Sequence, residues 1–404
     1  MKYVDFLFLI EHDDRESNTV KELCKSLEDK GYTYQMLSIE FHSHYLLFLK
    51  AGCVIFPYSI DSSRWPLSYF TGKRFKHTKF VSLNWEQLLS DANKAFKAPK
   101  GEFIQQYINH LCWSDDFQSF LLSSGVKKKN TRVIGNPNHA ILLGYMRQKD
   151  LEKVNLRKIS GIPDSAELVF FPMNYGWAFS SDKLIKKKIE MGYDKNIAWD
   201  YRDYSLACLY KFVFFSRDIA NADKNRYLVI RPHPSISIEQ YIDVFTSKIG
   251  KIPDNIIFSK DYSVREWISS ADIVGSSWST SVWDSAAVGK KAFLFTPLPR
   301  PSWLETYWNS LVPNISKPKD FALVEQFDSQ ELVIQTDMIE RIAHWIINLP
   351  EGNPVQCSTI VPFRTCFYFV RSFFRCFSVE FLNSSFIRKG LLRDYFRFSS
   401  RTNK

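Results

Sequence analysis

An apolar run leads straight into a basic turn in the sequence Tyr227-Leu228-Val229-Ile230-Arg231-Pro232-His233-Pro234. The apolar run predicts a buried strand. Proline fixes φ and supplies no N–H, so the turn is stiff and holds His233 at the carboxyl end of that strand. A histidine there can donate a charge-assisted hydrogen bond to a phosphate oxygen, although an isolated histidine is more often a structural turn residue.

Further apolar runs alternate with amphipathic stretches on both sides of this strand. Later in the chain we expect strands at residues 168–172, 256–258, 273–275 and 292–295, and a long helix at 201–220. In the first third we expect strands at 4–10, 34–37, 53–57 and 80–83, and helices at 19–30 and 103–124. Strands that alternate with helices imply parallel sheets. The sequence therefore predicts an α/β protein with two doubly wound, Rossmann-like domains facing a cleft.

The chain length agrees with this division, because 404 residues are enough for two domains with full hydrophobic cores. We place the crossover in the charged, turn-rich region at 125–158. The expected parts are an N-terminal domain at 1–140, a second domain at 141–350 and a basic, aromatic helical tail at 351–404.

Composition excludes several classes of protein. Hydrophobic residues make up 45% and charged residues 24%, which excludes wholesale disorder. The seven cysteines are scattered without a C-x-x-C pair, which suits a reducing cytosol and gives no zinc site. The short apolar start at residues 6–10 is expected to be a strand rather than a signal peptide, and no window is long enough for a spanning helix.

The basic charge is concentrated in the tail. The net charge is +10, and residues 361–404 hold seven Arg and two Lys against one Glu and one Asp. The same segment holds ten Phe, several of them spaced for one helix face. This composition suits a helix lying on an anionic membrane surface, and it equally suits a return helix packing on the N-terminal domain. The basic runs at 127–129 and 186–188 are interpreted as solvated surface, and no nucleic-acid partner is indicated.

A second phosphate-type signal follows the strand at 273–275. It reads Ser276-Ser277-Trp278-Ser279-Thr280-Ser281 and leads into a helical segment that contains Asp284. Hydroxyls and backbone N–H groups at a helix start form an anion site, although ordinary N-capping by Ser or Thr is as frequent. Asp284 is placed to accept hydrogen bonds from a ribose, or is a solvated helix carboxylate. Asn174 follows the strand at 168–172 and is a further candidate for lining a donor site.

Together these landmarks resemble the GT-B glycosyltransferases of bacterial surface-carbohydrate (capsule or O-antigen) assembly that carry a His-Pro motif and a Ser/Thr-rich motif. The quoted landmarks, in order, are 13–16, 84–87, 135–137, 231–235, and 279–290. The resemblance to transferases of CMP-linked ulosonic acids (sialic acid or Kdo type) implies that His233, Ser279 and Thr280 contact the donor phosphate, with Arg231, Ser276 and Ser277 beside them. Such enzymes usually have Glu where this chain has Asp284, which weakens the ribose assignment.

Glycosyl transfer also needs a carboxylate to deprotonate the acceptor hydroxyl or to act as a nucleophile. The resemblance implies that the domain at 1–140 is the acceptor-side domain and that the domain at 141–350 binds the nucleotide sugar. Glu86 follows the strand at 80–83 and is the first candidate. Asp13 and Asp14 follow the first strand and are the second candidates, and His233 is counted with the catalytic group. Each carboxylate taken alone is more often a solvated loop charge or a helix cap.

The expected protein is therefore a cytoplasmic glycosyltransferase, peripheral on the inner face of the cytoplasmic membrane, that transfers a sugar from a CMP-linked donor to a glycan or lipid-linked glycan. No metal or further cofactor is implied, since the resemblance and the lack of an Asp-x-Asp in a suitable strand context both favour phosphate stabilisation by the protein. One alternative is a CDP-polyol (glycerol or ribitol) phosphotransferase. The other is a non-catalytic scaffold of polysaccharide assembly.

Overall fold

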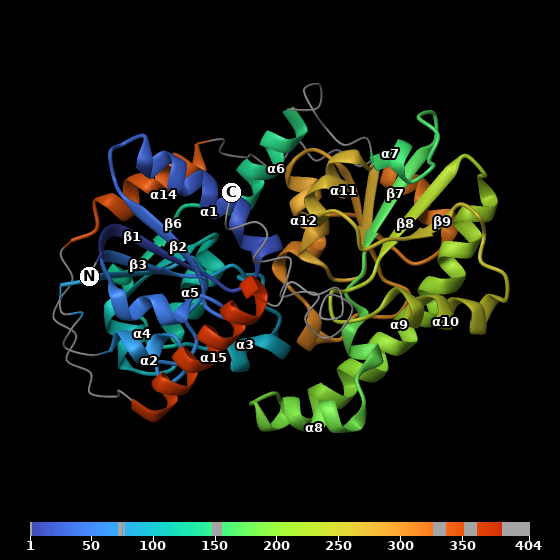
Figure 1. Ribbon diagram of the computed structural model, residues 1–404. Helices are drawn as coiled ribbons and strands as arrows, with labels where there is room; N and C mark the ends of the chain where they lie inside the picture. The colour runs from blue at the N-terminus through green and yellow to red at the C-terminus, as the bar shows by residue number, and fades with distance from the viewer. Residues whose placement is uncertain are drawn as a thin grey trace. The chain divides into compact units, whose positions relative to one another are not determined.

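A computed structural model describes residues 2–71, 75, 77–147, 156–325, 337–350 and 362–381. The chain divides into two compact units, one made of residues 1–87, 98–137 and 337–404 and the other of residues 88–97 and 138–336. Each unit is built on one six-stranded parallel sheet with helices on both faces (Figure 1). The predicted α/β fold with two doubly wound domains is therefore confirmed.

The first sheet has the strand order β2-β1-β3-β4-β5-β6. Its strands are β1 (Lys2–Ile10), β2 (Tyr34–Ser38), β3 (Leu49–Phe56), β4 (Lys79–Ser82), β5 (Ile108–Cys112) and β6 (Thr131–Val133). The helices of this unit are α1 (Asp13–Glu28), α2 (Leu67–Phe70), α4 (Glu102–Tyr107), α5 (Asp115–Ser123), α14 (Met338–Ile347) and α15 (Pro362–Phe381). Short 3-10 helices lie at η1 (Ser43–Phe48) and η3 (Lys128–Asn130).

Both faces of this sheet are buried. Helices α1 and α14 cover one face, where Phe8 and Ile55 of the strands pack with Leu23 and Ile342. On the other face, Phe56 and Phe80 pack with residues of η1, α2, α4 and α15. Residues buried on both sides explain why the strands read as continuous apolar runs in the sequence.

The second sheet has the order β12-β11-β10-β7-β8-β9. Its strands are β7 (Glu167–Pro172), β8 (Arg226–Arg231), β9 (Ile256–Phe258), β10 (Ile273–Ser276), β11 (Lys291–Phe295) and β12 (Asn314–Ile315). The helices of this unit are α3 (Asp91–Lys97), α6 (Pro137–Arg147), α7 (Leu156–Ile159), α8 (Asp182–Glu190), α9 (Lys195–Ala222), α10 (Ile238–Ile249), α11 (Val264–Ser270), α12 (Thr280–Ala287) and α13 (Ala322–Glu325). Helices α9 and α10 pack on one face, and α7 and α11 on the other.

Two predictions about local structure need correction. The helix expected at 103–124 is two helices separated by β5, because the apolar run at 108–112 is as compatible with a buried strand as with a helix. The helix expected at 19–30 instead spans Asp13–Glu28, so Asp13 and Asp14 form its first turn.

The boundaries of the units also differ from the predicted ones. Residues 338–349 lie in the first unit, because the apolar face of α14 packs against α1 (Figure 1). Helix α3 belongs to the second unit, where Ala92 packs with Tyr201 and Leu304. The described part of the tail, α15, packs on the first sheet through Phe369, and residues 382–404 lie outside the described residues.

Candidate functional site

The order of the second sheet reverses between its two central strands. Strands β7 and β10 are neighbours, and the chain runs outward from β7 through β8 to β9 and from β10 through β11 to β12. In open parallel sheets of this kind, ligands bind outside the carboxyl ends of the strands at such a reversal. The residues that follow β7, β8 and β10 therefore define the candidate site of this unit, and they include Asn174, His233 and Ser277.

Hydroxyl groups join the ends of the two central strands. The Ser276 Oγ donates to the Pro172 carbonyl oxygen at 2.7 Å and lies 3.4 Å from the Asn174 Oδ1. The Ser277 Oγ lies 2.5 Å from the Tyr175 phenol oxygen, and both residues are buried. Burial raises the pKa of Tyr175 well above its ordinary value, so its phenol stays protonated and available as a hydrogen-bond donor. Ser276 thus supports the local structure, while Ser277 belongs to a polar pair at the reversal.

His233 lies beside this pair. A Cβ placed on Gly176 would lie 3.5 Å from the His233 Nδ1, so the imidazole packs over the backbone that follows Tyr175. The Ser235 backbone N–H donates to the same Nδ1 at 3.3 Å, and the Ser235 Oγ lies 2.7 Å from it. Because a backbone N–H can only donate, Nδ1 acts as an acceptor and a neutral ring carries its proton on Nε2.

The surroundings favour the neutral form of this histidine. Although part of the residue is exposed, desolvation of the ring lowers the pKa of His233 below its ordinary value. The nearby ammonium groups of Lys260 and Lys188 lower the pKa further. A neutral imidazole with an Nε2–H group can donate to an anionic oxygen, and cations nearby favour the arrival of that anion.

Helix α12 begins directly after the Ser-rich turn. Ser279 is its N-cap, and the Ser279 Oγ accepts from the Ser281 backbone N–H at 3.4 Å. Thr280 is the first residue of the helix and is exposed. The positive end of the helix dipole lies here, where an anion is stabilised.

Two other predicted donor residues have partners within the unit. The Arg231 Nη1 donates to the Asp261 carbonyl oxygen at 2.9 Å. The Asp284 Oδ1 lies 2.9 Å from the Nε2 of His139, a buried residue of α6. Asp284 thus ties α12 to α6.

Sequence reasoning missed an aromatic cluster in the same unit. The Trp177 and Tyr201 rings stack at 4.8 Å, and Trp278 has an edge contact of 5.3 Å with Tyr175. The Lys188 Nζ lies 3.5 Å from the centre of the Trp177 ring, and burial lowers the pKa of this lysine. The aromatic content of 16% was the available signal, but the members come from separate segments of the sequence.

The loop after β4 in the first unit presents Glu86. Asn84 and Gln87 are buried and both donate through their side-chain amides to the Leu111 carbonyl oxygen, at 3.2 and 2.9 Å. Trp85 is buried in the core, whereas Glu86 is exposed. Because its neighbours are anchored on both sides, the loop holds Glu86 outward at the carboxyl end of β4.

The strand order of the first sheet also reverses, between β1 and β3, and two residues that the sequence did not single out meet there. The Tyr58 hydroxyl donates to the carboxylate of Glu11, which directly follows β1. The position of Glu11 at a strand end was a usable signal. For Asp13 and Asp14 the structure places only the backbone, in the first turn of α1.

Among the described residues, no group of three or more His, Cys, Asp and Glu side chains is arranged to hold a metal ion. None of the helices within the described ranges is sufficiently long and apolar to span a membrane.

Solved structures of known proteins share this fold. The crystal structure of UDP-GlcNAc 2-epimerase from Neisseria meningitidis bound to UDP-GlcNAc aligns with a TM-score of 0.54 at 11% identity, over 86% of this chain and 100% of that one. The wall teichoic acid polymerase TagF aligns with a TM-score of 0.51 at 12% identity, over 85% and 88%. The chain therefore has the GT-B fold. No family model matches the sequence, and no curated protein sequence matches it.

Proposed function

We propose that the protein is a glycosyltransferase of surface-polysaccharide synthesis whose nucleotide-linked donor binds at the carboxyl edge of the second sheet. The observation that carries the proposal is the conjunction of an imidazole, a buried hydroxyl pair and a helix start at one strand-order reversal. His233 packs over Gly176, and the adjoining Tyr175 bonds to Ser277 at 2.5 Å. The imidazole and the hydroxyls at the helix start are hydrogen-bond donors suited to a phosphate leaving group, and the buried pair links the segments that follow β7 and β10.

The phosphate has a specific set of partners in this proposal. The His233 Nε2–H and the hydroxyls of Ser279 and Thr280 donate to its oxygens, and the dipole of α12 favours the negative charge. As the glycosidic bond breaks, charge grows on the phosphate, so these donors stabilise the transition state more than the bound donor. Glu86 is the acceptor-side carboxylate that removes the proton from the attacking hydroxyl.

A CMP-linked ulosonic acid is the donor we favour. The support is the resemblance of the His-Pro turn at 231–235 and the Ser/Thr pair at 279–280 to transferases that use such donors. No further cofactor is required, because the nucleotide leaves with its phosphate held by protein donors.

A second candidate is transfer of a polyol phosphate from a CDP-linked donor. One specific observation favours it, namely the fold similarity to TagF, of which a variant soaked with CDPG aligns with a TM-score of 0.52 at 11% identity. Both reactions release CMP, but only the second adds phosphorus to the acceptor.

Calorimetry with CMP, CDP and UDP tests the proposal. We expect CMP to bind more tightly than UDP, and incubation with a CMP-ulosonic acid and a glycan to release CMP without adding phosphorus to the product. Phosphorus in the product would replace the first candidate with the second. If none of the three nucleotides binds, the enzyme assignment is overturned, and the non-catalytic scaffold is the remaining candidate.

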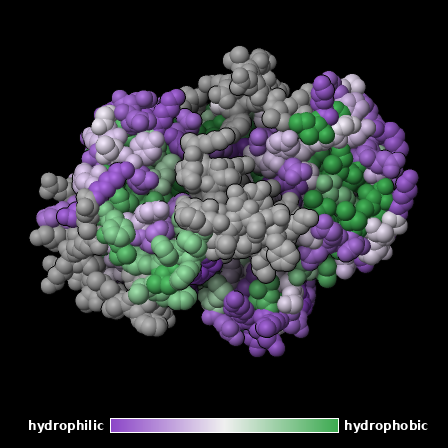
Figure 2. Space-filling model, viewed as in Figure 1, coloured by the Kyte–Doolittle hydropathy of each residue, from purple (hydrophilic) through white to green (hydrophobic). Residues whose placement is uncertain are grey.

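We further propose that the protein works at an anionic membrane, on the cytoplasmic face, through α15. The exposed apolar side chains of α15 include Phe367, Val370, Phe373, Phe374 and Phe377. Those of the adjoining η1 are Tyr45, Leu47 and Phe48. Figure 2 shows this hydrophobic surface over α15. An apolar surface of this kind next to a basic segment is typical of interfacial binding.

Vesicle flotation tests the membrane proposal. Phe373→Ser with Phe374→Ser should lower binding to vesicles of anionic lipid at least fivefold, because two exposed apolar side chains are lost. Phe214→Ser, an exposed Phe of α9, is the matched control and should leave flotation unchanged. Undiminished flotation of the double variant would refute the role of α15.

A further inference from the structure

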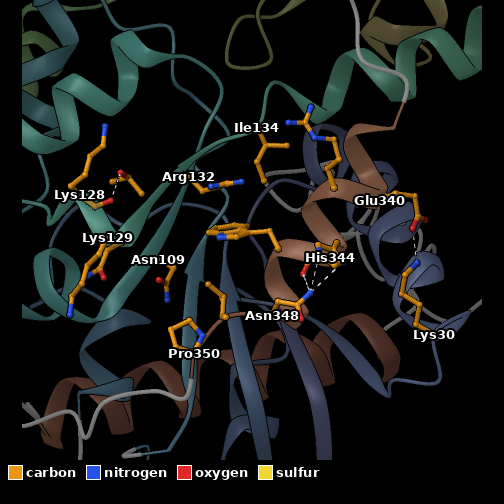
Figure 3. Close-up of a pocket in the computed structure, with 15 residues that line it drawn as sticks. Lys30, Asn109, Lys128, Lys129, Arg132, Ile134, Glu340, His344, Asn348 and Pro350 are labelled. Atoms are coloured by element: carbon orange, nitrogen blue, oxygen red, sulfur yellow. Dashed lines mark hydrogen bonds and ion pairs between the residues drawn. The ribbon is translucent and has the colours of Figure 1, made fainter.

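The first unit contains a pocket of about 830 Å³ that none of the candidate site residues lines (Figure 3). It begins at the amino ends of β5 and β6, extends along the edge strand β6 to Ile134, and is closed on its other side by α14. Its lining residues are Lys30, Asn109, Lys128, Lys129, Asn130, Thr131, Arg132, Ile134, Glu340, Arg341, His344, Trp345, Asn348, Leu349 and Pro350.

The pocket is strongly basic. Its lining includes five Lys and Arg residues and one carboxylate, Glu340. That carboxylate is already paired with Lys30, whose Nζ lies 2.6 Å from the Glu340 Oε2. The other four cations, Lys128, Lys129, Arg132 and Arg341, therefore have no carboxylate among the lining residues.

These four cations are poorly compensated elsewhere too. The Lys128 Nζ donates to a neutral acceptor, the Gln118 Oε1, at 2.7 Å. Within the part of the chain that the structure describes, the side chains of Lys129, Arg132 and Arg341 have no ion pair. In Figure 3 Arg132 lies between the lysines of η3 on one side and α14 on the other. Uncompensated like charges gathered around one cavity favour the binding of an anion.

The remaining lining residues are suited to a hydroxylated ligand. Amide and hydroxyl groups come from Asn109, Asn130, Thr131 and Asn348, and Trp345 adds a partly buried aromatic ring. The side-chain NH2 groups of Asn109, Asn130 and Asn348 each donate to a backbone carbonyl oxygen, so their Oδ1 atoms are the groups that accept from ligand hydroxyls. The indole presents an apolar face with one polar donor. The volume is far larger than one phosphate ion needs and lies in the usual range for ligands of many atoms, roughly 300 to 1,000 Å³.

We propose that this pocket binds a segment of an anionic glycan, a chain of hydroxylated units that carry carboxylate or phosphodiester groups. The inference rests on the proposed function, since the ligand is the growing polymer that serves as acceptor or product. The pocket contacts several units of the polymer at a distance from its reacting end. This second contact holds the polymer on the enzyme between transfers, because it raises the effective concentration of the reacting end at the site. A single-stranded nucleic acid is disfavoured, because such sites stack successive bases on several large aromatic rings. The lining of this pocket offers the Trp345 indole and only the His344 imidazole beside it.

Binding of defined polymers to the full chain tests the proposal. The probes are oligosialic acid for the carboxylate form, a poly(glycerol phosphate) oligomer for the phosphodiester form, neutral dextran and a single-stranded oligonucleotide of equal charge. One of the two anionic glycans should bind, with affinity falling as salt rises, and the double variant Arg132→Ala/Arg341→Ala should bind it at least tenfold more weakly. Lys21→Ala/Lys25→Ala removes two exposed charges of α1 outside the pocket and should change affinity less than twofold.

Each other outcome overturns the inference. Equal binding of the oligonucleotide would show a general polyanion surface, and equal loss in the two double variants would show a non-specific charge effect. Unfolding temperatures of both variants within about 2 °C of the parent exclude a folding defect, as expected for exposed or half-buried side chains. CMP calorimetry on the same samples separates the two proposals. A variant that loses polymer binding but keeps CMP binding has a defect in the pocket alone. A parent protein that binds no CMP contradicts the transferase assignment alone.

Discussion

The two sheets differ in strand order, but each contains one reversal of that order, and their carboxyl edges have opposite chemistry. The edge of the first sheet is supported by a buried network of Asn84, Gln87 and His110, whose side chains bond largely to backbone carbonyl oxygens. The carboxylate of Glu86 is exposed beside this network. The edge of the second sheet carries hydroxyls and His233, with Lys188 and Lys260 near that histidine. Two Rossmann-like sheets thus carry an acidic edge in one unit and a donor-rich edge in the other, and in both units the loops after the strands supply the chemistry.

The two edges are suited to different steps of glycosyl transfer. A carboxylate can accept the proton of an acceptor hydroxyl, and neutral or cationic hydrogen-bond donors stabilise the phosphate that leaves with the nucleotide. Changes on the first edge should therefore affect turnover, and changes on the second edge should affect nucleotide affinity.

The largest effect is expected from Glu86→Gln. If the carboxylate removes the acceptor proton, this change should lower kcat about 10² to 10⁴-fold, the usual range for loss of a general base. Affinity for CMP should stay within twofold of the parent, because Glu86 belongs to the first edge. Steady-state CMP release and calorimetry measure the two quantities.

Glu22→Gln is the matched control, since Glu22 is an exposed residue of α1 in the same unit. It should leave both quantities unchanged. A Glu86→Gln protein with near-normal turnover would remove Glu86 from the mechanism, and Glu11→Gln would then be the next substitution to measure, because Glu11 lies at the reversal of the first sheet.

The second prediction concerns the buried network that supports the first edge. Burial lowers the pKa of His110 to about 4, although the hydrogen bond from its ring to Ile104 opposes this. The unfolded state binds a proton near pH 6.5 and the folded state near pH 4, so stability is fully present above pH 6.5 and is lost as the pH falls between these values. The expected loss from pH 7 to pH 4 is about 3 kcal/mol for this group.

Urea unfolding at several pH values measures this dependence. His110→Gln should be less stable at pH 7, because Asn84 and Ile104 lose a well-placed partner, and it should lose about 3 kcal/mol less than the parent on acidification. An identical pH dependence in the parent and the variant would show that His110 does not titrate on unfolding.

The third prediction concerns the second edge. His233→Ala should weaken CMP binding about 10 to 100-fold, the cost of one hydrogen bond to a charged group. Ser235→Ala removes the partner of Nδ1 and should cost less than threefold, because the backbone N–H of residue 235 still donates to the ring. Equal affinity of His233→Ala and the parent would exclude the phosphate contact.

Much of this fold was predictable, because strands buried on both faces leave continuous apolar runs in the sequence. The strand β5 was missed, since five residues between two short helices read as part of one helix. The place of α14 was also unpredictable, because it lies at residues 338–347 and returns to a sheet completed two hundred residues earlier. Hydrophobic periodicity reveals an amphipathic face but not which sheet it covers.

The positions of the candidate residues His233, Ser277 and Glu86 after strand ends were predictable, because each follows an apolar run in the sequence. Contacts between residues that are distant in the sequence were not predictable. The contact of Tyr58 with Glu11 and the stack of Trp177 on Tyr201 are of this kind. The basic pocket of the first unit is a further example, because α14 and η3 are more than two hundred residues apart.

The smallest effect is expected from Asp284→Asn, which tests whether all polar groups of the second edge serve the nucleotide. The Asp284 Oδ1 is engaged by His139 at 2.9 Å, and His139 is buried against Trp283 with ring centroids 4.6 Å apart. The amide oxygen of Asn can still accept from the imidazole, so we expect a loss of about 1 kcal/mol in unfolding free energy and less than threefold in CMP affinity.

Calorimetry with CMP and with its 2′-deoxy analogue discriminates the alternatives. If the parent prefers CMP and Asp284→Asn loses that preference by tenfold or more, Asp284 contacts the ribose. If both ligands bind the two proteins alike, Asp284 joins α12 to α6, and the second edge, like the first, relies on a buried polar link behind the groups that meet the substrate.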